Sequence, residues 1–222
     1  MFYQAAMDLS GPAAVLAVAD ADGRMLIDSQ SPMRGREAAG LLPWMSERLE
    51  AESIAVDAID RWTIGAGPGS FTGMRLAAAL ITGLAFGRKT VRLRCVPTAV
   101  AVAAQAVTAP QPGERAAVLF DGRNHELLLF EVEFQAEWQP TGIERVLNQS
   151  DAASCLAAYD GNYFAAFAYD RPPLEALLPA PGRPRVVYLQ QLSGQPLLRA
   201  TYQQFDNDPA QLVYIRPAVF TE

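Results

Sequence analysis

The stretch IGAGPGSFTGMRLAAALITGLAFG, residues 64–87, decides how this chain folds. An apolar segment with strand character, residues 59–64, leads into a glycine-rich loop, and residues 72–86 have the composition of a helix. Glycine lets the backbone adopt positive φ and approach a neighbouring segment closely. The stretch therefore predicts a tight strand–loop–helix junction, where free amides at the helix N-terminus favour an anion or the close approach of another backbone.

Two kinds of residue shape this loop besides glycine. Pro68 fixes one φ angle and removes one hydrogen-bond donor. Ser70 or Thr72 is expected to cap the helix, because a hydroxyl oxygen there accepts an N–H of the first turn. The candidate loop site consists of Gly65, Gly67, Pro68, Gly69, Ser70, Phe71, Thr72 and Gly73.

Three interpretations of the loop compete. A Walker A loop requires a lysine after the glycines, and none follows them here. A dinucleotide fingerprint requires G-x-G-x-x-G, but Gly73 comes one position late and no convincing acidic ribose partner follows. The third interpretation is a turn packed for shape, followed by a closely packed helix. Small residues cover most of the circumference of that helix, which favours burial on one side by the chain's own sheet and on another by a partner. They are Ala77, Ala78, Ala79, Thr82, Gly83, Ala85 and Gly87.

Composition limits the class of protein. The chain has 222 residues, 50% of them hydrophobic and 19% charged, which fits one large globular domain or two small ones. Its formal net charge of −6 disfavours tight binding of nucleic acid by the chain alone. A local basic cluster, Arg88, Lys89, Arg92 and Arg94, is interpreted as the solvated start of a strand, with an RNA-facing patch as the alternative.

Cysteines and the N-terminus indicate the compartment. Cys95 and Cys155 are far apart and form no C-x-x-C pair, which is typical of reduced thiols in a cytoplasm. The N-terminal residues have no basic segment followed by an apolar one, and no apolar run reaches the roughly 20 residues that span a bilayer. We therefore expect a cytoplasmic protein without a membrane partner.

Periodicity predicts an α/β organisation in the first half. Expected strands are residues 2–7, 13–19, 24–28, 58–64 and 91–96, the first three as an antiparallel meander. Expected helices are residues 37–50, 72–86 and 98–107. The first of these has Leu41, Leu42, Met45 and Leu49 on one face, and Pro43 should kink it or delay its regular start.

The opening pattern returns after a linker at residues 109–114. Strands are expected at residues 115–120 and 126–134, so that Asp8 and Asp121 occupy matching places at the end of a first strand. This predicts an internal repeat at the level of supersecondary structure. Further on, helices are expected near residues 151–159 and 173–178, and strands near 163–168, 185–188 and 211–216.

Residues suited to catalysis are few. His125 is the only histidine, so neither a histidine metal pair nor an obvious Cys/His nucleophile pair is present. Asp8 and Asp121, with Ser10 beside the first, have the chemistry of carboxylates that hold Mg²⁺ and phosphates in a cleft. The alternative is that each aspartate ends a strand and caps a turn.

Several motifs together resemble the TsaB (YeaZ) family. The most specific is GAGPGSFTGMR at residues 65–75, followed by GLAFG at residues 83–87. Supporting motifs are DLS at 8–10, LLP at 41–43, VPT at 96–98, DGR at 121–123 and YIRP at 214–217. The resemblance implies the α/β actin-like ATPase (ASKHA, RNase H-like) fold, with two related lobes of mixed sheets flanked by helices. Residues 1–108 would form the N-terminal lobe and residues 109–222 a reduced C-terminal lobe.

The resemblance also implies a role without chemistry of its own. Proteins of this family are non-catalytic partners of a TsaD-like catalytic subunit in the synthesis of threonylcarbamoyladenosine on tRNA. A TsaE-like ATPase joins them, tRNA is bound only through the complex, and the chain alone is expected to form a homodimer. No metal or cofactor is expected, because no histidine pair stands near Ala38 and Leu42 in the first helix, where the catalytic paralogue has its own. The expected partner interface is Leu41, Leu42, Met45, Arg75, Leu76, Ala79, Leu80 and Gly83.

Two other functions are weighed against this one. One is an actin-fold phosphotransferase or ATPase that uses Asp8, Asp121 and the glycine loop, so that these residues with Ser10 would be a nucleotide cleft, vestigial or active. The other is a protease, for which the sequence offers no Ser/His or metal constellation.

Overall fold

The computed structural model describes residues 2–33, 39–178 and 185–215. These form two compact units. The first unit is Met1–Thr98 with Ser193–Leu212, and the second is Ala99–Leu192 with Val213–Glu222. In the described part of the chain, no helix has the length and apolar character needed to cross a membrane.

The first unit is built on a five-stranded mixed sheet in the order β3-β2-β1-β4-β5. Its strands are β1 (Tyr3–Asp8), β2 (Ala13–Ala19), β3 (Met25–Pro32), β4 (Ile59–Gly65) and β5 (Arg92–Val96). The meander β1–β2–β3 is antiparallel, whereas β4 and β5 run parallel to β1. The apolar runs of β2 and the ends of β1 and β4 are buried, as expected for a sheet that is covered on both faces.

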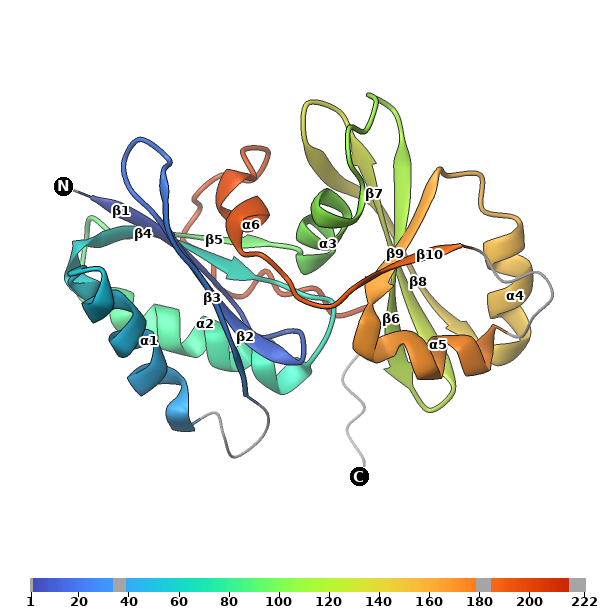
Figure 1. Ribbon diagram of the computed structural model, residues 1–222, viewed down its shortest axis with the longest axis horizontal. Coiled ribbons are helices and arrows are strands. Elements are labelled where there is room, and N and C mark those ends of the chain that lie inside the picture. Colours follow the sequence, from blue (N-terminus) through green and yellow to red (C-terminus); the bar gives the residue numbers. More distant parts are fainter. Residues whose placement is uncertain (1, 34–38, 179–184, 216–222) are drawn as a thin grey trace. The chain divides into compact units, whose positions relative to one another are not determined.

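Helices cover this sheet on both faces (Figure 1). Helix α1 (Leu41–Ala51) packs on β3, and α2 (Phe71–Ala85) packs on β1 and β4; both lie below the sheet in Figure 1. On the other face, the short helix α6 (Gln195–Arg199) packs on β1, β2 and β4. A 3₁₀ turn, η2 (Val56–Ala58), precedes β4. The start of the helix expected at residues 37–50 falls partly outside the described residues. Pro43 is the third residue of α1, where its missing N–H costs no helical hydrogen bond.

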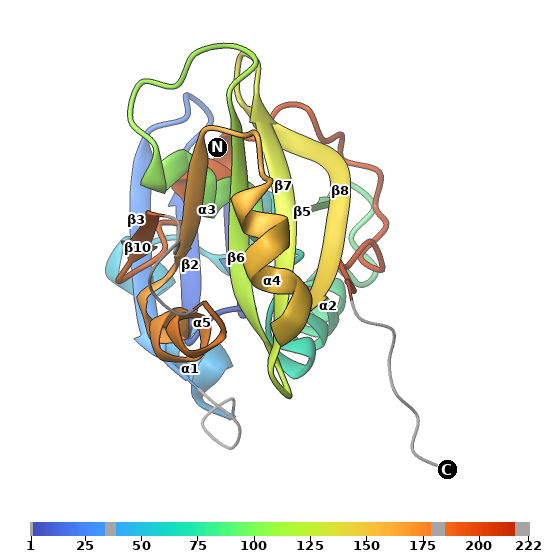
Figure 2. The ribbon, with the colours of Figure 1, turned by 90° about the vertical axis from the view of Figure 1, so that its right-hand side faces the viewer.

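The second unit repeats this architecture. Its strands are β6 (Arg115–Arg123), β7 (Glu126–Phe134), β8 (Trp138–Asn148), β9 (Tyr163–Phe167) and β10 (Val186–Leu189). Its helical segments are α3 (Thr98–Ala106), α4 (Gln149–Ala157), η3 (Ala168–Asp170) and α5 (Arg171–Leu177). The first residue of α3, Thr98, is also the last residue of the segment Met1–Thr98 of the first unit. Helices α4 and α5 pack against the sheet, and Figure 2 shows α4 in front of β7 and β8. The core beneath them includes Leu119, Leu129 and Leu174.

Both sheets have one topology, which confirms the predicted repeat and the predicted fold class. The second sheet reads β10-β9-β6-β7-β8, the first sheet's order with β6 in the place of β1. In each, three antiparallel strands are followed by two parallel ones. Two related α/β lobes with mixed sheets and flanking helices are therefore present.

The structure adds two elements that the sequence did not predict, and it corrects two expectations. Strand β8 was not expected, because most of its side chains are exposed and it has no apolar period. Helix α6 was not expected, because it has only five residues. The strand expected at residues 211–216 is absent over the described residues 211–215, where no neighbouring strand pairs with the apolar run. The second lobe is not reduced, since its sheet has as many strands as the first.

The units also differ from the expected division between residues 108 and 109. Ser193–Leu212 belongs to the first unit, and the second begins at Ala99. The return of the chain is secured by Asp28, whose carboxylate accepts hydrogen bonds from Ser193 Oγ at 2.5 Å and Gly194 N at 2.9 Å. The composition of residues 193–212 does not indicate that this segment packs in the first unit.

Candidate functional site

The glycine loop joins β4 to α2 as a tight junction. Ser70 is the N-cap of α2, and its Oγ accepts a hydrogen bond from the Gly73 amide at 3.2 Å. Of the two predicted caps, Ser70 is therefore confirmed. Thr72 lies inside the first turn with an exposed side chain.

The glycines of the loop make room for the turn that follows β1. A Cβ atom on Gly65 would overlap the Asp8 carboxylate, and one on Gly73 would overlap the carbonyl oxygen of Leu9. A Cβ atom on Gly69 would overlap the carbonyl oxygen of Ser10. Gly67 has a φ of +89°, in the region that only glycine occupies at low cost. The third interpretation of the loop, a turn packed for shape, is the one that these contacts support.

Asp8 joins the turn after β1 to the start of α3. Its Oδ1 accepts hydrogen bonds from the Ser10 amide and the Ser10 hydroxyl, both at 2.7 Å, and its Oδ2 accepts one from Thr98 Oγ1 at 2.5 Å. The Ser10 and Thr98 hydroxyl oxygens are 2.9 Å apart. Asp8 and Ser10 are almost fully buried, with 1% and 2% of their surface exposed. Burial raises the pKa of the Asp8 carboxyl, and the hydrogen bonds from Thr98 and Ser10 oppose that rise.

Two amides of the loop donate hydrogen bonds to other segments of the chain. Gly67 N donates to Thr98 Oγ1 at 3.0 Å, and Ser70 N donates to the Ser10 carbonyl at 2.7 Å. In return, Thr98 N donates to the Gly67 carbonyl at 2.6 Å. The Gly67 and Ser70 amides are thus engaged by the start of α3 and by the β1–β2 turn, and they are not available to a phosphate.

Asp121 belongs to the second unit, whereas Asp8, Ser10 and the glycine loop are brought together in the first. Its Oδ1 accepts a hydrogen bond from the Arg123 amide at 3.0 Å, two residues on, just as Asp8 accepts one from Ser10. The repeat therefore extends to the turn after the first strand of each unit. This geometry supports the turn-capping interpretation of both aspartates.

Helix α2 has a buried face and an exposed face. Met74, Ala77 and Ile81 are buried on the side of the sheet. On the exposed side, residues spaced by three or four positions line up along the helix: Phe71, Arg75, Ala79, Gly83 and, just after its end, Phe86. We call this set the α2 stripe. Phe86 is 87% exposed and Phe71 is 38% exposed, with the Arg75 guanidinium 3.7 Å from the centre of the Phe71 ring.

The predicted interface residues fall into three groups. Arg75, Ala79, Gly83 and Leu42 are exposed, and Leu76 and Leu80 are half-buried. Leu41 and Met45, however, are only 2% and 1% exposed, so they belong to the chain's own core. The prediction that these two residues lie at the partner interface is therefore wrong. An apolar helix face points to the core by default, and α1 follows that rule. Phe71 was predicted only as part of the loop, and Phe86 was not predicted as an interface residue. The position of Phe86, directly after a helix rich in small residues, could have indicated an exposed contact.

The remaining candidates of the sequence form no hydrogen bond with the glycine loop or Asp8 among the described residues. His125 is in the turn between β6 and β7, with a φ of +61°. Cys95 is buried, and its burial together with the charges of Asp206 and Asp208 raises the pKa of its thiol to about 12. No cluster of three or more His, Cys, Asp or Glu side chains suited to a metal ion occurs among residues 2–33, 39–178 and 185–215.

Comparison with known proteins places the chain in a family. Residues 37–153, just over half of the chain, match the model of the family described as TsaD: tRNA N6-adenosine threonylcarbamoyltransferase. The chain is 33% identical over 93 residues to the tRNA threonylcarbamoyladenosine biosynthesis protein TsaB of Haemophilus influenzae. That alignment spans 41% of this chain and only 38% of the relative.

Solved structures extend the similarity over the whole chain. YeaZ from Pseudomonas aeruginosa superimposes with a TM-score of 0.73 at 26% sequence identity, covering 96% of this chain and all of that one. A second Pseudomonas aeruginosa structure, of a protein described as similar to peptidase YeaZ, gives the same TM-score and covers 97% of this chain. The duplicated sheet topology, the glycine junction and these matches agree, and the chain belongs to the TsaB/YeaZ family, within the wider group that the TsaD model describes.

Proposed function

We propose that this chain is a non-catalytic subunit in the biosynthesis of threonylcarbamoyladenosine on tRNA. In this role it pairs with a TsaD-like catalytic subunit through the exposed sides of α1 and α2. A TsaE-like ATPase joins the pair, and tRNA is bound by the complex rather than by this chain alone. The name of the Haemophilus influenzae relative supports the pathway, and the α2 stripe carries the assignment of a binding role.

The α2 stripe has the character of a protein interface. Aromatic residues are enriched in protein interfaces, and Phe71 and Phe86 are exposed at the two ends of the α2 stripe. Ala79 and Gly83 between the two phenylalanines leave space for another helix to approach, and no atom lies within 4 Å of the place where a Gly83 Cβ would stand. Leu42, 47% exposed on α1, adds a further apolar contact on the same face of the sheet.

The hydrogen bonds of Asp8 support a non-catalytic role. Its carboxylate already accepts three hydrogen bonds from Ser10 and Thr98, and the Gly67 amide of the loop donates to Thr98. A phosphotransferase of this fold would need these groups for the nucleotide and its metal ion. We therefore place the phosphotransferase interpretation second and the protease interpretation last.

The same face predicts the behaviour of the isolated chain. An apolar patch without its partner tends to be covered by a second copy of itself, which gives a two-fold symmetric contact. We expect a homodimer in solution that is replaced by a one-to-one pair when the TsaD-like subunit is added.

Reconstitution tests the proposed function. The TsaD-like subunit of the same organism, the TsaE-like ATPase and the enzyme that supplies the threonylcarbamoyl group are mixed with unmodified tRNA, with or without this chain. Mass spectrometry of the digested tRNA then measures the modified nucleoside. We expect product only when this chain is present, and we expect Ala79→Glu on the α2 stripe to abolish it. Equal product without this chain would contradict the proposal.

A parallel assay separates the alternative function. The isolated chain is incubated with Mg²⁺-ATP, and phosphate release is compared with that of Asp121→Asn. We expect no release above background from either protein. Release that depends on Asp121 would favour the phosphotransferase.

A further inference from the structure

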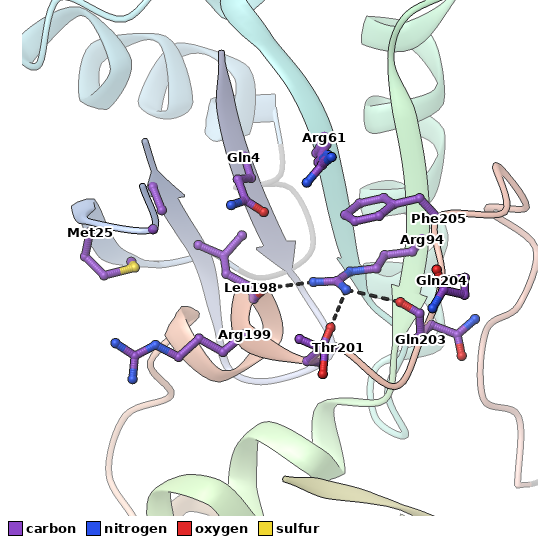
Figure 3. A pocket seen from close by; sticks show the side chains of 13 residues that line it. Gln4, Met25, Arg61, Arg94, Leu198, Arg199, Thr201, Gln203, Gln204 and Phe205 are labelled. Carbon is purple, nitrogen blue, oxygen red and sulfur yellow. Dashed lines mark hydrogen bonds between the residues drawn. The ribbon is translucent and has the colours of Figure 1, made fainter. Parts of the chain in front are cut away.

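A second region of the first unit has the features of a binding site and plays no part in the proposed function. It is a cavity of about 540 Å³, shown in Figure 3, with Gln4 near the beginning of β1 in its lining. Asp8 is at the other end of that strand. Its walls come from the starts of β1 and β4, from β5 and from the segment that follows α6. Small-molecule sites in proteins commonly have volumes of this order, about 300–1,000 Å³.

Arg94 builds the floor of this cavity. Its guanidinium donates to the carbonyl oxygens of Leu198 at 2.8 Å, Leu197 and Gln203 at 3.1 Å each, and Ala200, and its Nε donates to Thr63 Oγ1 at 2.9 Å. The side chain is 4% exposed. It ties the last turn of α6 and the following segment to the sheet, so that the wall of the cavity is fixed (Figure 3).

A second anchor holds the far side of the same wall. The backbone of Leu93 and Asn207 is joined by a bond from Asn207 N to the Leu93 carbonyl at 3.0 Å, and Leu93 N donates to Asn207 Oδ1 at 2.8 Å. The Phe205 ring, which lies between these anchors, faces Arg94 with 4.4 Å between the guanidinium carbon and the ring centre. These contacts hold the wall of the cavity in place.

Two further arginines line the cavity with guanidinium groups that are available to a ligand. Among the residues that the structure describes, the side chains of Arg61 and Arg199 form no hydrogen bond or ion pair. Arg61 is held by stacking, since its guanidinium carbon lies 5.4 Å from the centre of the Phe2 ring and 5.5 Å from that of Phe205. A pre-positioned guanidinium loses less conformational entropy when it binds an anion.

The charge around the cavity contrasts with that of the chain. Three arginines line it and no aspartate or glutamate does, in a chain whose net charge is −6. Three of the acidic residues that neighbour lining residues along the chain are engaged elsewhere: Asp20 caps its own turn at Asp22 and Arg24, Asp60 lies 3.8 Å from Arg88 Nη2, and Asp206 accepts from Asp208 N and Gln211 Nε2. The fourth, Asp22, is exposed. A concave wall with one sign of charge concentrates the electric field and attracts counter-ions.

We propose that this cavity, named here the arginine pocket, binds a phosphate-bearing ligand through Arg61 and Arg199. Guanidinium groups match phosphate oxygens in geometry and charge, and two of them on different walls suit an anion with more than one charge. The side-chain amides of Gln4 and Gln204, which also line the arginine pocket, can serve uncharged parts of the ligand. The phosphate is either that of a free small molecule or that of an RNA backbone.

Binding measurements on the whole chain test this proposal in two arms. In the first, inorganic pyrophosphate is titrated into the chain by calorimetry. In the second, a fluorescently labelled unmodified tRNA transcript is titrated at several salt concentrations by anisotropy. We expect a dissociation constant of about 1 mM or tighter in at least one arm, weakened about tenfold by Arg61→Gln and by Arg199→Gln. Gln204→Glu, which adds a negative charge and leaves both arginines in place, should also weaken binding.

The two arms identify the source of the phosphate. Arginine-dependent binding of pyrophosphate assigns a free phosphorylated ligand, and arginine-dependent binding of tRNA alone assigns an RNA phosphate. The control is Arg145→Gln, which removes an exposed arginine of β8 in the second unit. The proposal is overturned if neither probe binds, or if binding is unchanged in the Arg61→Gln, Arg199→Gln double variant. Because these assays need no TsaD-like subunit, their failure leaves the proposed function untouched. Arginine-dependent binding of tRNA by the isolated chain would replace the expectation that tRNA is bound only by the complex.

Discussion

Asp8 is the residue on which the junction of the first unit depends. The glycines opposite it leave space for its carboxylate, and Ser10 and Thr98 supply the hydrogen bonds that make its burial tolerable. Burial is still the largest influence on this group and raises the pKa of the carboxyl. Asp8 is thus a positioning residue of the fold, whose protonation is linked to stability.

The pH dependence of stability tests this view. An acid whose pKa is higher in the folded state contributes most to the free energy of unfolding below its unfolded pKa of about 3.9, and that contribution is lost as the pH rises through the folded pKa. Asp8→Asn cannot titrate. The free energy of unfolding of the variant minus that of the wild type should therefore increase between pH 4 and pH 8, as measured by urea denaturation. A difference that stays constant or falls would contradict the assignment.

Cys95 gives a second prediction for a single residue. Its thiol is 3% exposed and has a pKa of about 12. At pH 8 only about one in 10⁴ such thiols is ionised, and the thiolate is the reactive form. The native chain should therefore react with a disulfide reagent at one thiol, Cys155, and the chain in denaturant at two. The Cys155→Ser variant provides the control, and rapid labelling of native Cys155→Ser would disprove the protection of Cys95.

Among the elements, α2 combines two kinds of glycine. Gly73 faces the turn after β1, where a Cβ would overlap the Leu9 carbonyl, while Gly83 faces open space ten residues further on. The sequence shows two glycines in one helix, and only the structure separates the one required by packing from the one that leaves a surface open.

Alanine at these two positions should act in opposite directions. Gly83→Ala should increase the free energy of unfolding by about 0.5–1 kcal/mol, because alanine restricts the unfolded chain more than glycine. Gly73→Ala should decrease it by about 1–3 kcal/mol, because the added methyl group forces the β1–β2 turn and α2 apart. Urea denaturation of the two variants measures both values. Equal effects would mean that the turn does not press on α2 in solution.

Elements with strong periodicity could be predicted from the sequence, and those without it could not. Strands β2 and β7 have the predicted bounds, because each is a run of mostly apolar residues that ends at polar turn residues. Strand β8 was missed because it lies at a sheet edge with mostly exposed side chains, and α6 because its role depends on Arg94, about a hundred residues away. Leu41 and Met45 were assigned to the partner surface because a sequence does not tell which apolar face of a helix is covered by its own chain.

For the whole molecule, the duplicated topology explains both the fold and the candidate site. Each unit repeats a strand, an aspartate and a turn, and this part was visible in the sequence as Asp8 and Asp121. The arginine pocket was not, because its walls come from residues 4, 19, 23, 25, 61, 94, 198–201 and 203–205. Long-range assembly of this kind has no local pattern to predict it.

The central claim is that the α2 stripe pairs with a TsaD-like subunit, and light scattering after size-exclusion chromatography tests it most directly. The chain is run alone and mixed with the TsaD-like subunit of the same organism, as wild type, as Gly83→Leu and as Ala153→Leu. Ala153→Leu is the matched control, since it adds the same side chain at an exposed position of α4.

We expect the wild type and Ala153→Leu to form a one-to-one complex. Gly83→Leu should remain folded, because the position is open within the chain, but its affinity should fall at least about tenfold, because the added side chain holds the two helices apart. The absence of a complex with the wild type, or equal affinity of Gly83→Leu and Ala153→Leu, would contradict the claim.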